Sequence, residues 1–203
     1  MEMHHFDEET YILANRIVDY TLDRLKNDPP PLDGTESAKV LLPKYKHLIT
    51  EEGLGAQKAF NFYENIVSLA TISTDHPRYL SFVPNAPSNA ASLFDLVVSA
   101  SSVYGGTWLE GAGVVAAENQ ALRFLSDMIG FPEKSGGVFV SGGTAANLSA
   151  LIAARYDFRS KQPKYEKTRL SILCATSAHS SIRQAMRAMD FDIVDVDGDE
   201  DGR

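Results

Sequence analysis

The sequence predicts an α/β protein with a parallel sheet, because its second half alternates short apolar runs with segments of helical periodicity. The apolar runs are Val138–Val140, Leu170–Ala175 and Phe191–Val196, and each has the length of a buried strand. Between them, apolar residues recur at helical spacing from Thr144 to about Phe158 and from Ser177 to Met189. A succession of strand, helix, strand, helix and strand implies parallel strands joined by right-handed crossovers.

Composition narrows the classes of function. The chain has 203 residues, of which 44% are hydrophobic, so it is long enough to bury a core. A net charge of −8 without a basic stripe argues against general nucleic-acid binding. Cys174 is the single cysteine, and no cysteine–histidine spacing typical of zinc sites occurs, so His4 and His5 are interpreted as terminal residues rather than metal ligands. A polar N-terminus and the lack of a long apolar run favour a cytoplasmic protein.

Residues 1–75 are predicted to form a helical N-terminal segment, and residues 76–203 to form the first part of the sheet domain. Asp7 is placed to cap a helix that runs to about Lys26 and ends before the proline-rich stretch 27–34. The apolar stripe of this helix consists of Tyr11, Ile12, Val18, Leu22 and Leu25. The stripe needs a covering surface, and both its own domain and a partner subunit are open alternatives.

Other elements precede the predicted sheet. A break is expected at Pro43, and a second helix is expected over Glu51–Ile72. The stretch 74–92 is rich in proline and aromatic residues, which is typical of an ordered loop that lines a site, and a packed loop without a ligand is the alternative. Further expected elements are a helix beginning over Leu93–Val98, a glycine-rich connection over Tyr104–Gly113 and a helix over Val114–Ile129.

A candidate anion site follows the first predicted strand. Ser141, Gly142 and Gly143 interrupt the apolar run, and Thr144 opens the next helix. Unpaired N–H groups and the helix dipole favour an anion at such a helix start, although an ordinary turn capped by Thr144 is the alternative. His179 opens the following helix at the same edge of the sheet, so the topology brings it near the turn. A histidine that only packs or caps the helix is the alternative.

Four stretches resemble one family in the same order along the chain. They are HPRYLSFVPNAPS (76–88), SVYGGTWLEGAGVVAAENQALRFL (102–125), VFVSGGTAANLSALIAAR (138–155) and ATSAHSSIRQAM (175–186). They are similar to the group II pyridoxal-phosphate-dependent amino-acid decarboxylases, relatives of the aromatic amino-acid and glutamate decarboxylases. The resemblance runs from about Glu2 to the end of the chain. It implies the type I, aspartate aminotransferase-like fold, with the front part of its large domain present here.

The resemblance also implies a cofactor and roles for individual residues. By it, the Gly143 N–H and Thr144 hold the phosphate of pyridoxal 5'-phosphate, and Ser141 and Gly142 shape the turn. His179 stacks on the pyridine ring as a catalytic residue. The enzyme removes the α-carboxylate of an L-amino acid through an external aldimine, as an obligate homodimer with active sites between subunits. Residues expected to face the substrate are Val83, Pro84, Asn85 and Tyr104.

Members of this family carry a Schiff-base lysine, and before it an aspartate that pairs with the pyridine nitrogen. No lysine follows Lys167 in this sequence, and Asp192, Asp195 and Asp197 come too early in the topology to replace that aspartate. We therefore expect the front portion of an enzyme, inactive alone and completed by a second polypeptide that carries the lysine. A terminal Arg203 suits a proteolytic cut, and a split gene or a truncation is equally allowed.

Alternative functions remain open at this stage. One is a non-catalytic phosphate-ligand-binding or scaffolding remnant of such an enzyme, and another is an enzyme of the same fold and cofactor with a different reaction. A serine hydrolase built on Ser141 is disfavoured, because Phe139 stands where a nucleophile elbow requires glycine.

Overall fold

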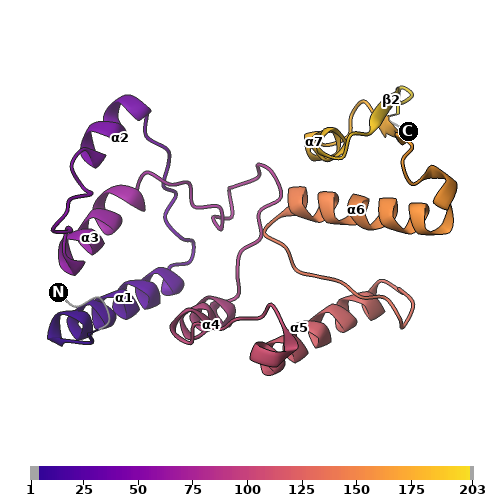
Figure 1. Ribbon diagram of the computed structural model, residues 1–203. Coiled ribbons are helices and arrows are strands. Elements are labelled where there is room, and N and C mark those ends of the chain that lie inside the picture. The colour runs from indigo at the N-terminus through magenta and orange to yellow at the C-terminus, as the bar shows by residue number, and fades with distance from the viewer. Residues whose placement is uncertain (1–4, 202–203) are drawn as a thin grey trace. The chain divides into compact units, whose positions relative to one another are not determined.

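The computed structural model describes residues 5–201, and the chain falls into two compact units, Met1–Val103 and Tyr104–Arg203 (Figure 1). Three residues named above lie outside the described part of the chain: Glu2, His4 and Arg203. The predicted division into a helical segment, 1–75, and the first part of a sheet domain, 76–203, stays a prediction. Within the described part, no helix is long and apolar enough to cross a membrane.

The first unit is helical. Its elements are α1 (Glu8–Lys26), α2 (Ala38–Tyr45), α3 (Ala56–Phe62), the π-helical turn η1 (Tyr63–Val67) and α4 (Asn89–Ala100). Helix α1 begins as expected, because the Asp7 carboxylate accepts hydrogen bonds from the Thr10 N–H at 2.8 Å and the Thr10 hydroxyl at 2.7 Å. It also ends as expected at Lys26, before the proline-rich stretch.

Aromatic and ionic contacts hold α1 against α3 and η1. The Tyr20 ring meets the rings of Phe60 and Tyr63 edge-on, at centroid distances of 5.6 and 5.9 Å. The Arg16 guanidinium lies 4.7 Å from the centroid of the Phe60 ring and pairs with Glu64 at 2.6 Å. Helix α1 therefore packs on its own unit, which is one of the two alternatives that the sequence left open.

The face of α1 that packs is not the predicted apolar stripe. Leu13, Ile17 and Tyr20 are half-buried residues, whereas Tyr11 and Leu22 of the predicted stripe have exposed fractions of 55% and 37%. Long aromatic and arginine side chains cover α3 as effectively as aliphatic ones, and a count of aliphatic residues does not reveal them. Four residues of the predicted stripe thus form an additional exposed apolar face, namely Tyr11, Ile12, Val18 and Leu22, whereas Leu25 is half-buried.

Three expectations for helix boundaries need correction. Pro43 does not separate elements, because it lies in the last turn of α2, where its missing N–H removes a single hydrogen bond. The second predicted helix begins only at Ala56, because Gly53 and Gly55 turn the chain with φ angles of 77° and 80°. Helix α4 begins before Leu93, because the Ser88 side chain caps it by accepting from the Ala91 N–H at 3.2 Å.

The second unit contains the sheet. Its elements are α5 (Trp108–Met128), α6 (Gly143–Lys161), the 3-10 turn η2 (Pro163–Tyr165), β1 (Ser171–Ala175), α7 (Ser180–Ala188) and β2 (Asp192–Val196). Helix α5 begins inside the predicted glycine-rich connection and bends at Gly111, whose φ and ψ of −126° and 30° are not helical. It ends as predicted before Gly130, which has a φ of 74°.

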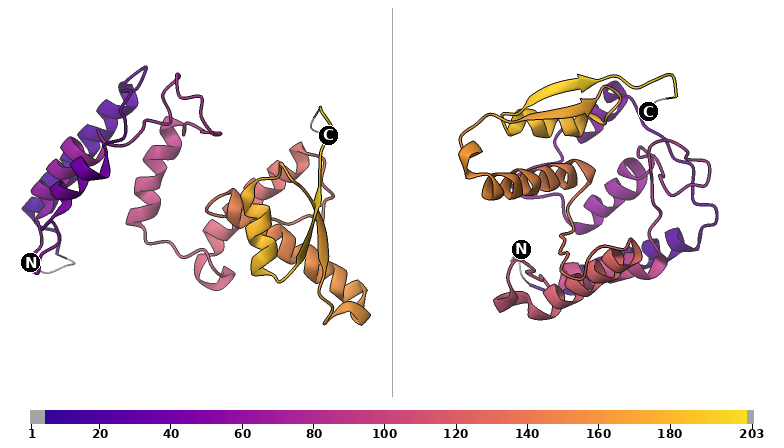
Figure 2. Two further views of the ribbon diagram at one scale, coloured as in Figure 1. Left: turned by 90° about the horizontal axis from the view of Figure 1, so that it is seen from above. Right: turned by 90° about the vertical axis from the view of Figure 1, so that its right-hand side faces the viewer.

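Two parallel strands and α7 form the core of this unit. Strands β1 and β2 pair from Ser171 opposite Asp192 to Ala175 opposite Val196, which confirms the predicted parallel pairing. Met186 of α7 is fully buried, and it clusters with Ala185 and Met189 against Leu148, Leu151, Ile172, Phe191 and Ile193. The right-hand view of Figure 2 shows the strands lying over α7, with α6 on the far side of α7. Helix α7 is therefore packed between α6 and the two-stranded sheet.

The predicted strand Val138–Val140 is wrong for the described structure. The segment is extended but pairs with no strand in the described part of the chain, and its side chains are exposed. It runs along α5 instead, where the Phe139 N–H donates to the Glu118 carboxylate at 3.4 Å. A strand is defined by its hydrogen-bonded neighbour, and an apolar sequence run does not supply one.

Candidate functional site

The glycine turn before α6 presents unpaired backbone donors. Helix α6 begins at Gly143, with Gly142 as its N-cap residue. Gly142 has a φ of 152°, a conformation that residues with a side chain rarely adopt. Among the described residues no side chain caps this helix, so the N–H groups of its first turn are available to an external acceptor.

The space in front of the turn is open. A Cβ atom added at Gly142 or Gly143 would meet no atom within 4 Å. Ser141 and Thr144, on either side of the glycines, are exposed and bring a hydroxyl each. An anion can therefore approach the backbone closely, and it meets the positive end of the α6 dipole there.

His179 occupies the start of the next helix. It is the N-cap residue of α7, and its Nδ1 atom accepts from the Ser181 N–H at 3.2 Å. The same Nδ1 atom lies 2.8 Å from the Ser181 hydroxyl oxygen. These contacts fix the ring through Nδ1, while the residue as a whole is exposed. His179 thus offers its Nε2 side to its surroundings.

A hydrogen bond joins the starts of α6 and α7. The Asn147 side-chain amide lies on α6, one turn after Gly143, and donates to the Ser181 hydroxyl at 2.8 Å. The two helix starts that the topology was expected to bring together are therefore linked through these side chains. Sequence reasoning gave Asn147 and Ser181 no role, although Asn147 stands four residues after Gly143 and so lies on the same face of α6.

The residues expected to face the substrate lie elsewhere in the chain. Val83, Pro84 and Asn85 belong to an exposed loop of the first unit, and Val83 is 97% exposed. Tyr104 begins the second unit, and its ring lies so close to Gly106 that a Cβ there would collide with it. The contact of these four residues with a substrate stays a prediction.

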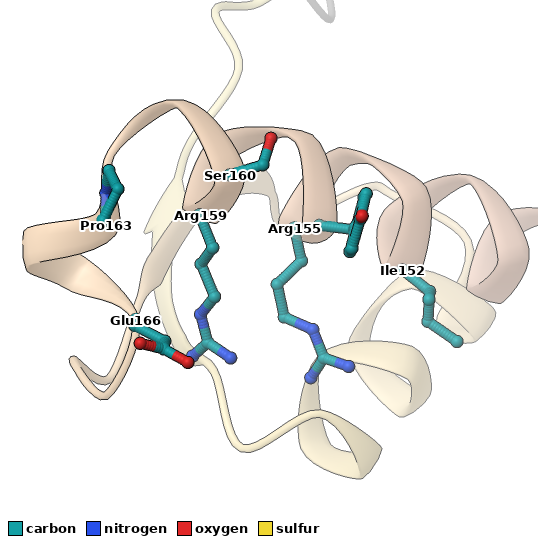
Figure 3. A pocket seen from close by; sticks show the side chains of 7 residues that line it. Ile152, Arg155, Arg159, Ser160, Pro163 and Glu166 are labelled. Carbon is teal, nitrogen blue, oxygen red and sulfur yellow. The ribbon is translucent and has the colours of Figure 1, made fainter.

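A cavity of about 510 Å³ lies at the opposite end of α6 (Figure 3). Arg155 and Arg159 extend to the same side of the helix there, and Glu166, which follows η2, lines the same cavity beside Arg159. At 1.5 Å per residue, Arg155 is about 18 Å along the helix axis from Gly143. The cavity is therefore separate from the glycine turn.

The fold identifies a class of protein. The chain is similar to the crystal structure of Oryza sativa TDC with PLP and tryptamine, with a TM-score of 0.82 and 22% identity over 99% of this chain and 44% of that one. It is also similar to the glutamate decarboxylase domain of diaminobutyrate-pyruvate transaminase and L-2,4-diaminobutyrate decarboxylase from Vibrio parahaemolyticus, with a TM-score of 0.79 and 19% identity over 98% of this chain and 47% of that one. The chain thus has the type I fold of pyridoxal-phosphate enzymes.

Sequence comparison identifies the family within this class. Residues 43–203 match the pyridoxal-dependent decarboxylase conserved domain, and the chain belongs to this family. The aromatic-L-amino-acid decarboxylase of Bacillus atrophaeus is 32% identical over 149 residues, which cover 73% of this chain and 31% of that protein. The chain thus spans about a third of the length of the curated relatives it matches.

Proposed function

We propose that the start of α6 binds the phosphate of pyridoxal 5'-phosphate in an amino-acid decarboxylase, and that His179 lies over the cofactor ring. The proposal is carried by one observation: an uncapped, glycine-opened helix start stands beside an exposed histidine to which it is hydrogen-bonded through Asn147 and Ser181. Family membership supports the choice of cofactor.

The residues of the turn fit a phosphate group. The first-turn N–H groups of α6 supply donors, and the bare Gly142 and Gly143 leave room for the phosphate oxygens. The hydroxyls of Ser141 and Thr144 add side-chain donors on either side. When bound, pyridoxal phosphate supplies an electron sink for the electron pair released at the substrate α-carbon. The turn anchors the far end of the cofactor and so orients its ring.

In this proposal His179 positions the substrate. Its Nδ1 atom is committed to Ser181, so the Nε2 side faces outward and can donate to the carboxylate that leaves as CO₂. A donor held at one position by Ser181 would fix the orientation of that carboxylate. Val83, Pro84, Asn85 and Tyr104 complete the substrate side of the site in the proposal.

The proposal assigns further parts of the enzyme to polypeptide beyond these 203 residues. The Schiff-base lysine comes from such polypeptide, and the chain by itself is inactive. Two copies of the complete enzyme form a homodimer in the cytoplasm, and the exposed apolar face of α1, which includes Tyr11, Val18 and Leu22, is the dimer contact.

The experiment uses the complete enzyme and measures cofactor content, CO₂ release and amine product. Aromatic L-amino acids come first in the substrate panel, since the 32% identical relative is named for them, followed by histidine, glutamate and 2,4-diaminobutyrate. We expect one amine product and one CO₂ per turnover. Borohydride reduction and peptide mass spectrometry then locate the lysine that carries the cofactor. Bound cofactor without CO₂ release from any amino acid would contradict the decarboxylase assignment.

A further inference from the structure

We infer that Ser181 holds the His179 ring in the tautomer that carries its proton on Nε2, and that Asn147 orients the Ser181 hydroxyl for this task. Asn147 and Ser181 are thus positioning residues for His179, and their role in the reaction rests on the function proposed above. The contacts that link α6 to α7 through Asn147, Ser181 and His179 are observed in the structure and do not depend on that function.

The first step is the geometry of these contacts. The Asn147 amide nitrogen lies 2.8 Å from the Ser181 Oγ, and Ser181 Oγ lies 2.8 Å from His179 Nδ1. Ser181 is 1% exposed, so water does not compete for its hydroxyl. A buried hydroxyl with two polar neighbours forms both hydrogen bonds, because an unmade one is costly there.

The second step is the direction of each hydrogen bond. The Ser181 backbone N–H donates to His179 Nδ1, so this nitrogen carries no proton. The Ser181 hydroxyl must then donate to Nδ1 as well, because two acceptors cannot form a hydrogen bond with each other. Its oxygen therefore accepts from Asn147, for which only the amide N–H₂ end is suitable. The directions of all three hydrogen bonds are consistent with one another.

The third step is the consequence for the ring. A neutral imidazole with an accepting Nδ1 carries its proton on Nε2, the atom that faces away from Ser181. Asn147 stands one turn after Gly143, so a single rigid helix carries both the phosphate-binding N–H groups and the anchor of His179. The position of the phosphate and the orientation of the Ser181 hydroxyl that donates to the His179 ring thus both depend on α6.

The test reverses one hydrogen bond without changing the shape of the side chain. Asn147→Asp replaces the donor by an acceptor, so the Ser181 hydroxyl turns toward the new carboxylate and no longer donates to Nδ1. The Ser181 backbone N–H still donates to Nδ1, so we expect the proton of His179 to stay on Nε2 and the ¹⁵N chemical shift of Nδ1 to change, because this atom loses one of its two donors. The shifts are read in the ¹⁵N-histidine-labelled complete enzyme, with and without cofactor. His179→Gln assigns the signal among the histidines. Ser149→Asp adds the same charge to an exposed position of α6 and should leave the Nδ1 chemical shift of His179 unchanged.

Activity provides the second readout. Asn147→Asp should lower kcat about tenfold, the effect of one misdirected hydrogen bond, with cofactor affinity and unfolding temperature close to those of Ser149→Asp. A His179 ring that carries its proton on Nδ1 in the unaltered enzyme overturns the inference, and so does an Nδ1 chemical shift that is equal in Asn147→Asp and the unaltered enzyme, whether or not the enzyme proves to be a decarboxylase. A changed Nδ1 shift with unchanged kcat overturns the role in the reaction. An enzyme that lacks decarboxylase activity but shows the Nε2 proton and the changed Nδ1 shift contradicts the proposed function alone.

Discussion

The helices α6 and α7 lie side by side in one unit, but they begin in opposite ways. Helix α6 starts at a glycine pair, and no described side chain caps it, whereas α7 starts at His179, whose ring accepts from the Ser181 N–H. Both starts belong to the candidate site. A capped start is satisfied within the protein, whereas the N–H groups of an uncapped start are free to bind water or a ligand. In the candidate site, α6 is therefore the helix that can bind a ligand at its start, and α7 is the helix that holds the His179 ring in place.

The stability cost of the open start is small. Glycine at an N-cap position is only a few tenths of a kcal/mol worse than serine or asparagine, whereas alanine costs about 1 kcal/mol. The φ of 152° at Gly142 already requires glycine there. The sequence of the turn is thus consistent with both its backbone conformation and access for an anion.

The largest expected effect separates capping by His179 from its role in the reaction. Asparagine is a good N-cap residue but has no imidazole, so His179→Asn keeps the start of α7 while removing the ring. We expect kcat to fall about 100-fold or more, with far smaller losses of cofactor affinity and unfolding temperature. The measurements are CO₂ release, cofactor titration and thermal unfolding.

His179→Ala completes this experiment, because it removes both the cap and the ring. It should match the asparagine variant in kcat and unfold at a lower temperature. Equal losses of turnover and cofactor affinity, or no loss of either, would make His179 a structural cap like Asp7 of α1.

The next effect concerns the open start of α6. Gly143→Val places a branched side chain where the phosphate must approach, and a Cβ there meets no protein atom, so the fold should persist. We expect the Kd for pyridoxal phosphate to rise at least about tenfold, which is about 1.4 kcal/mol. Equilibrium dialysis measures the Kd.

Gly113→Val is the matched control, because Gly113 also lies in a helix with open space at its Cβ position. Its Kd for the cofactor should stay near that of the unaltered enzyme. An unchanged cofactor content in Gly143→Val would refute the phosphate assignment and leave α6 with an ordinary open start.

The features of the fold and the candidate site differ in how readily they can be predicted from the sequence. The α6 start could be predicted, because an apolar run, a glycine pair and a helical pattern follow one another within a few residues. The pairing of β1 with β2 could also be predicted, since strand–helix–strand topology implies it. Both depend on neighbours in the sequence or on a general rule of chain topology.

Features that depend on a distant partner were missed. Val138–Val140 has the composition of a strand, but strand formation needs hydrogen bonds that its own sequence does not specify. Asn147 and Ser181 are 34 positions apart, and only the packing of α6 on α7 brings them within 2.8 Å. The packed face of α1 was missed for the same reason, because Tyr20 and Arg16 gain their partners from α3 and η1.

A smaller effect tests the link between the two helix starts. Ser181→Ala removes the hydroxyl that connects Asn147 with His179 and leaves the half-buried amide without this acceptor. We expect the free energy of unfolding to fall by about 1–2 kcal/mol, measured by denaturant titration. Ser180→Ala, at an exposed neighbouring position, should change it by less than about 0.5 kcal/mol. Equal effects of the two variants would mean that the link does not contribute to stability.

The smallest effect extends the comparison to α1, a helix whose cap is a titrating carboxylate. The hydrogen bond from the Thr10 N–H is the main reason why the pKa of Asp7 lies below its ordinary value. Because this pKa is lowered on folding, the cap contributes fully above the pKa of a free aspartate, about 3.9. The contribution is lost as the pH falls through the lower, folded pKa, since the unfolded chain then binds more protons.

Asp7→Asn isolates this contribution, because asparagine also caps helices but does not titrate in this range. The difference in unfolding free energy between the unaltered protein and this variant should be constant near neutral pH and should change only below about pH 4. Asp7→Ala removes the cap itself and should destabilise α1 at neutral pH as well. Parallel pH profiles for the unaltered protein and Asp7→Asn would show that the carboxylate charge adds nothing to the cap, and α1 would then resemble the neutral start of α4 rather than a charge-assisted one.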